Sequence, residues 1–138
     1  MADGFTFELV SPEMLLVSGE AEIVSIPGAE GDMGVLANHA PVMTSLRPGL
    51  VNAKMADGAE QSYFVRGGFA DVTQETLTVL AEFAVPQAEM TREIFAEQQK
   101  LAQEEFDKHH AAGNAEAAAN ARSYLEQLNH LEPVLLPV

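Results

Sequence analysis

The apolar residues of this chain change their spacing at Pro86, and this change constrains the fold more than any other feature. Before Pro86 they alternate with polar residues, as Phe5, Phe7 and Leu9 do, and such alternation is typical of β-strands. After Pro86 glycine and β-branched residues become scarce, and alanine, glutamate and glutamine dominate. The sequence therefore predicts an α+β protein, mainly β, with a β domain at residues 1–86 and a helical domain at residues 87–138.

Short strands separated by turn signals fill the first part of the chain. The dipeptide Asp57-Gly58 is the clearest hairpin signal, because it fits a tight turn between two antiparallel strands. Many short strands with regular turns predict an antiparallel sandwich or barrel. The candidate strands are Phe5–Leu9, Met14–Ser18, Glu22–Ile26, Val42–Leu46, Leu50–Met55, Gln61–Val65 and Leu77–Val79, and the other turn signals are Pro27-Gly28, Pro48-Gly49 and Gly67-Gly68.

Two apolar stripes at helical spacing follow Pro86. Gly113-Asn114 separates them, and the side chain of Asn114 is placed to cap the second helix. Pro133 is expected to end that helix. The sequence thus predicts an antiparallel two-helix hairpin. The first stripe comprises Met90, Ile94, Phe95, Leu101, Ala102 and Phe106, and the second comprises Ala117, Ala121, Tyr124, Leu125, Leu128 and Leu131.

The chain is strongly acidic, with 21 acidic against 7 basic residues and a formal net charge of −14 at pH 7. This charge opposes binding to nucleic acid and to anionic lipid, which requires clusters of lysine and arginine. A basic or polar protein partner is favoured instead, although charge that only keeps the chain soluble explains the composition equally well. The N-terminus does not resemble a signal peptide, and no apolar run has the length of a membrane span.

The segment Glu30–Gly49 concentrates glycine, proline and one histidine, His39, in a turn-dense connection of the kind that often carries binding function. We expect the His39 ring to bond to turn backbone, because no metal-ligand spacing and no Ser-His-Asp pattern accompanies it. The nearby glycines do not predict a phosphate loop, since Glu30 and Asp32 would repel phosphate. We therefore expect no catalytic residue, no metal site and no cofactor.

Four stretches of this chain resemble, in order, the epsilon subunit of F-type, proton-translocating ATP synthases. They are FELVSPEMLLVSGEAEIVSIPG from Phe7, EGDMGVLANHAPVMTSLRPG from Glu30, FVRGGFADV from Phe64 and LTVLAE from Leu77. The resemblance covers essentially the whole chain and implies an N-terminal antiparallel β-sandwich followed by a C-terminal antiparallel two-helix hairpin. Ala37-Asn38 departs from the family pattern, which often has Pro-Gly or Pro-Asn before the His-Ala-Pro, and Asn38 is expected to fill the role of the glycine with a left-handed backbone.

The resemblance implies a non-catalytic rotor subunit in the central stalk of the F1 sector. Its β domain would bind the gamma subunit and rest on the ring of c subunits, and its hairpin would be able to reach the alpha and beta subunits. The chain would lie at the cytoplasmic face of the bacterial inner membrane, held there only by the complex. The implied partner-binding residues are Glu30, Gly31, Asp32, Gly34, His39 and Pro41.

Within this set, we hypothesise that Asp32 contacts a c-ring arginine and that His39 lies near gamma. Loop acids that only aid solubility are the simpler alternative. A different class of function, a free-standing β-sandwich binding module with a helical hairpin for dimerisation, also fits the sequence. Co-purification with the alpha, beta and gamma subunits would distinguish the rotor subunit from the module.

In parts of the family the hairpin obstructs ATP hydrolysis through basic residues. The second helix of this chain carries a single cation, Arg122, so we predict weak or absent inhibition. Some members also bind ATP through an I-D-x-x-R-A motif, where this chain has A-E-M-T-R-E. Glu89 and Arg92 match in kind, but Glu93 replaces the alanine and only Arg122 is left to hold phosphate, so ATP binding is disfavoured.

Overall fold

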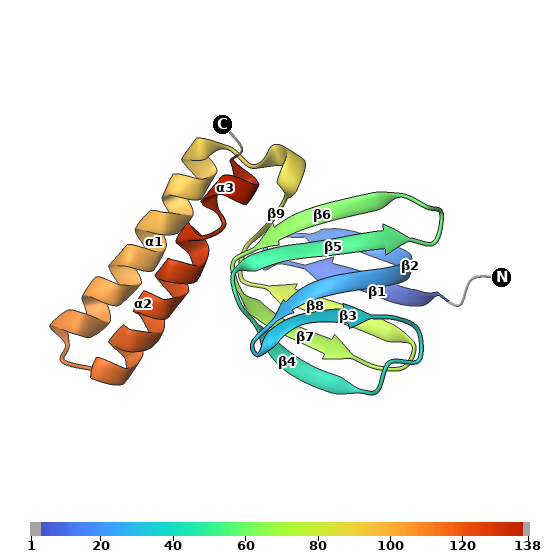
Figure 1. Cartoon of the computed structure of the whole chain (residues 1–138), viewed down its shortest axis with the longest axis horizontal. Coiled ribbons are helices and arrows are strands. Elements are labelled where there is room, and N and C mark those ends of the chain that lie inside the picture. Colours follow the sequence, from blue (N-terminus) through green and yellow to red (C-terminus); the bar gives the residue numbers. More distant parts are fainter. Residues whose placement is uncertain (1–3, 137–138) are drawn as a thin grey trace. The chain divides into compact units, whose positions relative to one another are not determined.

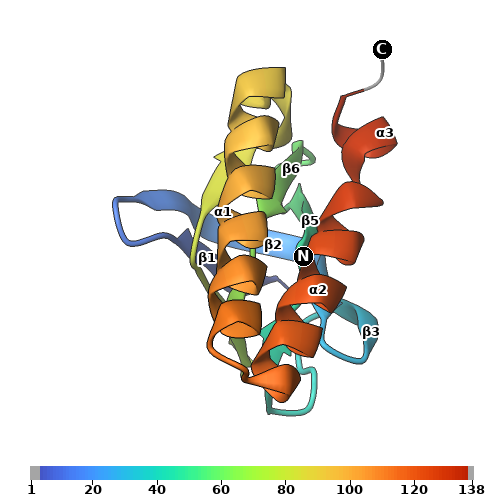
Figure 2. The same cartoon turned by 90° about the vertical axis from the view of Figure 1, so that its left-hand side faces the viewer.

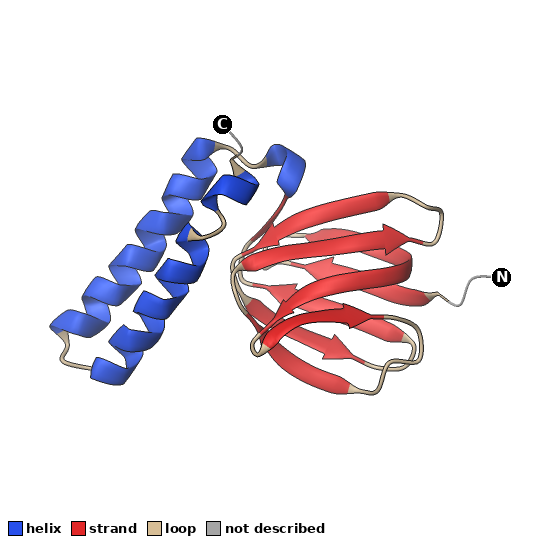
Figure 3. Cartoon of the chain, in the orientation of Figure 1, coloured by secondary structure: helices blue, strands red, loops and turns tan. Residues whose placement is uncertain are grey.

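The computed structural model describes residues 4–136 and contains two compact units, Met1–Ala88 and Glu89–Val138. The strands lie in the first unit and the α-helices in the second (Figure 3). The predicted sandwich followed by a helical hairpin is confirmed. The elements are β1 (Phe5–Val10), β2 (Leu15–Gly28), β3 (Gly31–Val35), β4 (Val42–Leu46), β5 (Gly49–Met55), β6 (Glu60–Val65), β7 (Gly68–Val72), β8 (Thr76–Ala81), β9 (Ala84–Pro86), η1 (Gln87–Glu89), α1 (Arg92–Ala111), α2 (Ala115–Asn129) and α3 (Glu132–Leu135).

The strands of the first unit are hydrogen-bonded in the order β1-β8-β7-β4-β2-β5-β6-β9, with β3 attached to β2 (Figure 1). An additional pairing of β1 with β2 closes the sheet on itself. The pairings are antiparallel except that of β1 with β8, which is parallel. The first strand of the chain is therefore held in place by one of the last strands of its domain.

The long strand β2 replaces two shorter strands of the sequence prediction, at Met14–Ser18 and Glu22–Ile26. The chain does not turn between them, because Gly19 and Ala21 stay paired with Phe7 and Phe5 of β1. The register of β2 against β5 shifts between Ala21 and Ile23, and such a bulge bends a strand. The first part of β2 thus pairs with β1 and its later part pairs with β5 and β3.

The core of the sandwich follows from the alternation in the sequence. In β1 the side chains of Phe5, Phe7 and Leu9 are buried and those between them are half-buried. Burying side chains of this size stabilises the fold by about 1.5–3 kcal/mol each. Fully buried partners from the other strands are Val24, Ile26, Val35, Val51, Val65, Val72, Leu77 and Val79.

The hairpin expected at Asp57-Gly58 joins β5 to β6. Gly58 has φ 92°, a backbone conformation that side chains disfavour, and the Asp57 carboxylate accepts a hydrogen bond of 2.9 Å from the Ala59 N–H. This prediction is confirmed.

The second unit is an antiparallel pair of helices (Figure 2). The Asn114 side chain caps α2 by accepting a bond of 3.1 Å from the Ala117 N–H, as predicted. The prediction that Pro133 ends this helix was wrong: α2 ends at Asn129, and Pro133 lies in the first turn of α3. A proline is tolerated there because the first turn of a helix leaves its N–H groups without intrahelical partners.

Candidate docking surfaces

The acidic tip predicted from the sequence is the turn between β2 and β3, at Ala29-Glu30. Gly28 and Gly31 face each other across the base of this turn, and Gly31 has φ 147°. The side chains of Glu30 and Asp32 are exposed. The turn therefore presents two carboxylates on a hairpin whose backbone conformation depends on glycine.

Arg47, between β4 and β5, binds this hairpin at three points. Its Nη2 lies 2.5 Å from Oδ1 of Asp32, and its Nε donates a bond of 2.7 Å to the Gly28 carbonyl. Its backbone N–H donates a bond of 2.9 Å to the Pro27 carbonyl. Asp32, for which we hypothesised a contact with an arginine of a partner, is thus already paired with an arginine of its own chain. Glu30 has no hydrogen bond or ion pair to any residue that the structure describes.

A surface hollow lies between this turn and β4. Its walls include Glu30 and Asp32 on one side and Val42 and Met43 on the other. Met43 is 68% exposed, which is unusual for a large apolar side chain. The hollow thus combines an apolar wall with an acidic rim.

His39 follows β3 in a half-buried position and is separated from the acidic turn by that strand. Its Nδ1–H donates a bond of 2.7 Å to the Ala40 carbonyl, in agreement with the expectation that the ring bonds to turn backbone. Asn38 has φ 66°, which confirms the expected left-handed residue, and its N–H donates to the Gln74 carbonyl. Pro41 is exposed beside His39, whereas Gly34 is an exposed position within β3.

An exposed apolar row, which sequence analysis missed, crosses the outer side of four strands. The register places Leu15 of β2 beside Val10 of β1, Val10 beside Leu80 of β8, and Leu80 beside Phe69 of β7. Leu15, Leu80 and Phe69 are 55%, 52% and 57% exposed. A contiguous exposed apolar surface is typical of a protein-binding face.

A signal for this row was present in the sequence. In LTVLAE the buried positions are Leu77, Val79 and Ala81, so Leu80 occupies a position that alternation assigns to the outer side. Phe69 stands at the equivalent outer position beside buried Ala70. The outward side of a half-buried strand is normally polar, and apolar residues there indicate a covered face.

The sequence is similar to a family of known proteins along its whole length. The family model for "ATP synthase, Delta/Epsilon chain, beta-sandwich domain" matches residues 4–87. The ATP synthase epsilon chain of Mesorhizobium japonicum is 47% identical over 137 residues, which cover 99% of each chain, and that of Allorhizobium ampelinum is 45% identical over the same length and coverage. The chain belongs to the ATP synthase epsilon chain family. The resemblance inferred from the sequence is confirmed.

The structure of this chain is also similar to a solved one. A chain in the cryo-EM structure of the Euglena gracilis mitochondrial ATP synthase, titled "OSCP/F1/c-ring in rotational state 1", superposes with a TM-score of 0.70 at 24% identity. The match covers 96% of this chain and 82% of the Euglena chain. At that identity the likeness establishes the shared fold.

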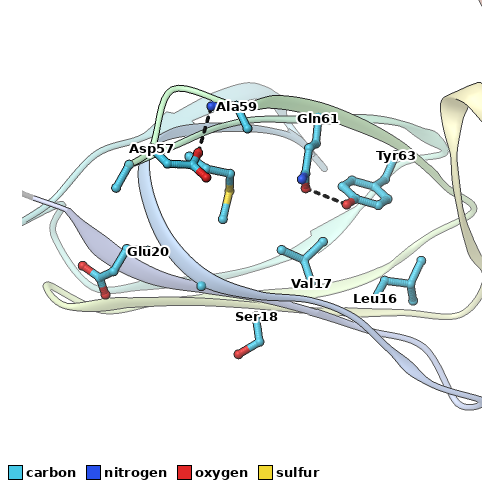
Figure 4. Close-up of a pocket in the computed structure, with 11 residues that line it drawn as sticks. Leu16, Val17, Ser18, Glu20, Asp57, Ala59, Gln61 and Tyr63 are labelled. Carbon is cyan, nitrogen blue, oxygen red and sulfur yellow. Dashed lines mark hydrogen bonds between the residues drawn. The ribbon is translucent and has the colours of Figure 1, made fainter.

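A second hollow lies between β2 and the β5–β6 hairpin (Figure 4). The Tyr63 hydroxyl donates a bond of 2.7 Å to Gln61 Oε1, and burial raises the pKa of Tyr63. Glu20 lines the same hollow, and Asp57 there accepts the Ala59 N–H. These groups do not pair a nucleophile with a base.

Within residues 4–136, no group of three or more His, Cys, Asp or Glu side chains could hold a metal ion. None of the helices described is long and apolar enough to cross a membrane.

The three residues considered for nucleotide binding are not brought together. The side chains of Gln99 and Asn129 are joined by a bond of 2.8 Å, which fixes the level at which α1 lies beside α2. Arg92 lies seven residues before Gln99, and Arg122 lies seven residues before Asn129 on the antiparallel helix. At about 1.5 Å per residue the two arginines are therefore separated by roughly 20 Å along the hairpin. Glu89 precedes α1 in η1, and Arg122 has a partner in Glu126 at 3.9 Å.

Proposed function

We propose that this chain is a non-catalytic rotor subunit of a proton-driven ATP synthase, which couples the gamma subunit to the c-ring. Its sandwich, residues 1–86, would dock on both partners, and the helical hairpin, residues 87–138, would have at most a weak regulatory role. The subunit would lie at the cytoplasmic face of the bacterial inner membrane as a peripheral part of F1. Membership of the epsilon chain family and the exposed apolar row together support this proposal.

The exposed apolar row carries the gamma contact in this proposal. The four side chains span neighbouring strands of one closed sheet, so they form a surface of fixed shape rather than a mobile loop. A stiff apolar surface suits a contact that must hold while torque passes through it, since salt does not screen the attraction between apolar surfaces as it screens that between charges. In this proposal His39 and Pro41, which lie between β3 and β4, are at the border of the gamma contact.

The acidic turn at Glu30, Gly31 and Asp32 carries the c-ring contact. Its carboxylates suit the polar, cationic loops expected of the ring, and a charged contact gives orientation and rapid docking more than affinity. Gly34, on the exposed edge of β3, belongs to the same hairpin.

Co-purification tests the proposal directly. A tagged chain expressed in its own host should recover the alpha, beta and gamma subunits, and Phe69→Glu should reduce the recovery of gamma because a carboxylate would be buried in an apolar contact. Lys54→Glu on β5, outside the row, is the matched control and should leave recovery unchanged. Isolation of the unchanged chain as a lone monomer or homodimer would favour the free-standing binding module instead.

We propose further that the hairpin inhibits ATP hydrolysis weakly or not at all. Arg122 is the cation that α2 offers to an acidic catalytic segment, and Glu126 lies 3.9 Å from it. Assembled F1 with a chain truncated after Pro86 should hydrolyse ATP at nearly the rate of F1 with the whole chain. A several-fold rise in the rate would contradict this part of the proposal.

A further inference from the structure

The carboxylate of Asp32, in the acidic turn, already has a cationic partner within this chain. It is 77% exposed, as expected of a docking group, yet one of its oxygens lies 2.5 Å from Arg47 Nη2. A carboxylate already paired with a guanidinium has less net attraction for a second cation, because the two opposite charges nearly cancel at a distance.

The position of Arg47 is itself strongly fixed. Its side chain is 31% exposed, much less than that of Asp32, and its Nε–H donates to the Gly28 carbonyl at 2.7 Å. The Arg47 N–H donates to the Pro27 carbonyl, and the next strand begins at Gly49. Arg47 thus joins the connection between β4 and β5 to the base of the acidic turn through its guanidinium and its backbone N–H.

Glu30 is the remaining charge of the turn. It is exposed, has no partner among the described residues, and lines the hollow opposite Val42 and Met43. A lysine or arginine side chain fits this arrangement, since its aliphatic stem can lie on an apolar wall while its charged head reaches a carboxylate.

We propose that Arg47 is a positioning residue that holds Asp32 within the turn and so leaves Glu30 as the carboxylate that binds a cationic side chain of the docking partner. This inference rests on the proposed function, in which the acidic turn docks on the c-ring. It changes the residue that makes the charged contact from Asp32 to Glu30, and it gives Asp32 a structural part.

Docking of assembled F1 onto F1-stripped membranes, measured over a range of salt concentrations, tests the assignment of Glu30. Glu30→Gln in the full chain should weaken docking about two- to fivefold at low salt, and the difference should vanish at high salt. Glu13→Gln, which removes an exposed acid from the β1–β2 turn, is the matched control and should dock as the unchanged chain does.

The role of Arg47 is tested by the salt dependence of the same docking. Arg47→Gln frees Asp32 as a second carboxylate, so docking should depend more steeply on salt than with the unchanged chain. Arg47→Lys keeps the charge beside Asp32 and should restore the original salt dependence. Mere loosening of the turn would weaken docking at every salt concentration and would not make the dependence steeper.

Two results would overturn the inference: docking by the Glu30→Gln chain that equals the unchanged one at low salt, or an unaltered salt dependence for Arg47→Gln. The proposed function fails in a different way, if F1 lacking the chain docks as well as F1 that contains it. The two failures are therefore distinguishable in one set of measurements.

Discussion

Alanine at Gly68 should destabilise the sandwich severely. Gly68 has φ 132°, and a Cβ built there would lie 2.0 Å from the Leu80 carbonyl oxygen and 2.9 Å from the Ala81 Cα. Both atoms belong to the backbone of β8, which pairs with β7 at this point, so no side chain can rotate away to make room. The substitution must therefore displace part of the β7–β8 ladder.

The expected loss is the sum of two effects. A positive φ at a residue other than glycine costs about 1–3 kcal/mol. Displacing one or two ladder hydrogen bonds costs about 1 kcal/mol each. The free energy of unfolding should therefore fall by about 2–5 kcal/mol, a large fraction of the stability of an ordinary domain, which is about 5–15 kcal/mol.

Alanine substitutions at two other glycines distinguish the cost of the positive φ from the cost of the clash with β8. Gly58 also has a positive φ, of 92°, but a Cβ there would meet nothing within 4 Å, so Gly58→Ala should cost only about 1 kcal/mol. Gly34 lacks both a positive φ and a close neighbour, and Gly34→Ala should change the free energy by less than about 0.5 kcal/mol.

Urea unfolding followed by far-ultraviolet circular dichroism measures all three variants. With a slope of about 1.5 kcal/mol per molar urea, Gly68→Ala should lower the midpoint by about 2 M, and Gly58→Ala by less than about 1 M. Equal midpoints for these two variants would refute the reasoning, because the clash with β8 would then add nothing to the conformational strain.

Three predictions concern the helical unit. Asn114→Ala should lower the stability of the hairpin by about 1 kcal/mol, because it removes the cap on the Ala117 N–H. Thermal unfolding followed by the helical circular dichroism signal measures this loss, and an unchanged melting curve would contradict the prediction. Gln98 is 3% exposed, and its buried Oε1 has no hydrogen-bond partner among the residues that the structure describes. Gln98→Leu should therefore raise hairpin stability by about 1 kcal/mol in the same assay, and a decrease would show that the amide is better satisfied than its surroundings indicate. Because Arg92 and Arg122 lie far apart on the hairpin, calorimetric titration of the full chain with ATP should give no binding heat, and a saturable signal would require another arrangement of the helices.

Local sequence signals predicted the elements well wherever neighbouring residues decide them. Val42–Leu46 coincides with β4, and the turn at Asp57-Gly58 and the cap at Asn114 are as expected. The error in β2 arose because residues far away in the sequence decide its length. β2 continues through Gly19 because β1 remains paired with it, and nothing within a short window of the sequence shows this.

The acidic turn was predicted from the sequence as a contact surface, but its internal chemistry was not. Arg47 and Asp32 are fifteen residues apart, and they meet only because β4 returns beside the end of β2, where Leu46 pairs with Gly28. The exposed apolar row was similarly missed, since Val10, Phe69 and Leu80 come together only through the register of three strands.

The parallel pairing of β1 with β8 also has a consequence for biosynthesis. Thr6 pairs with Thr76 and Val10 with Leu80, so β1, which leaves the ribosome before β8, cannot complete its ladder until the chain has been synthesised beyond residue 80. Until then β1 has only β2 to pair with, and its other edge stays open to misassembly. Non-local pairing of this kind also slows folding, whereas the helical hairpin is built from contacts local in sequence. The nascent sandwich is thus the slower and more vulnerable of the two units, and any chaperone that assists this chain would be needed most while β8 is still being translated.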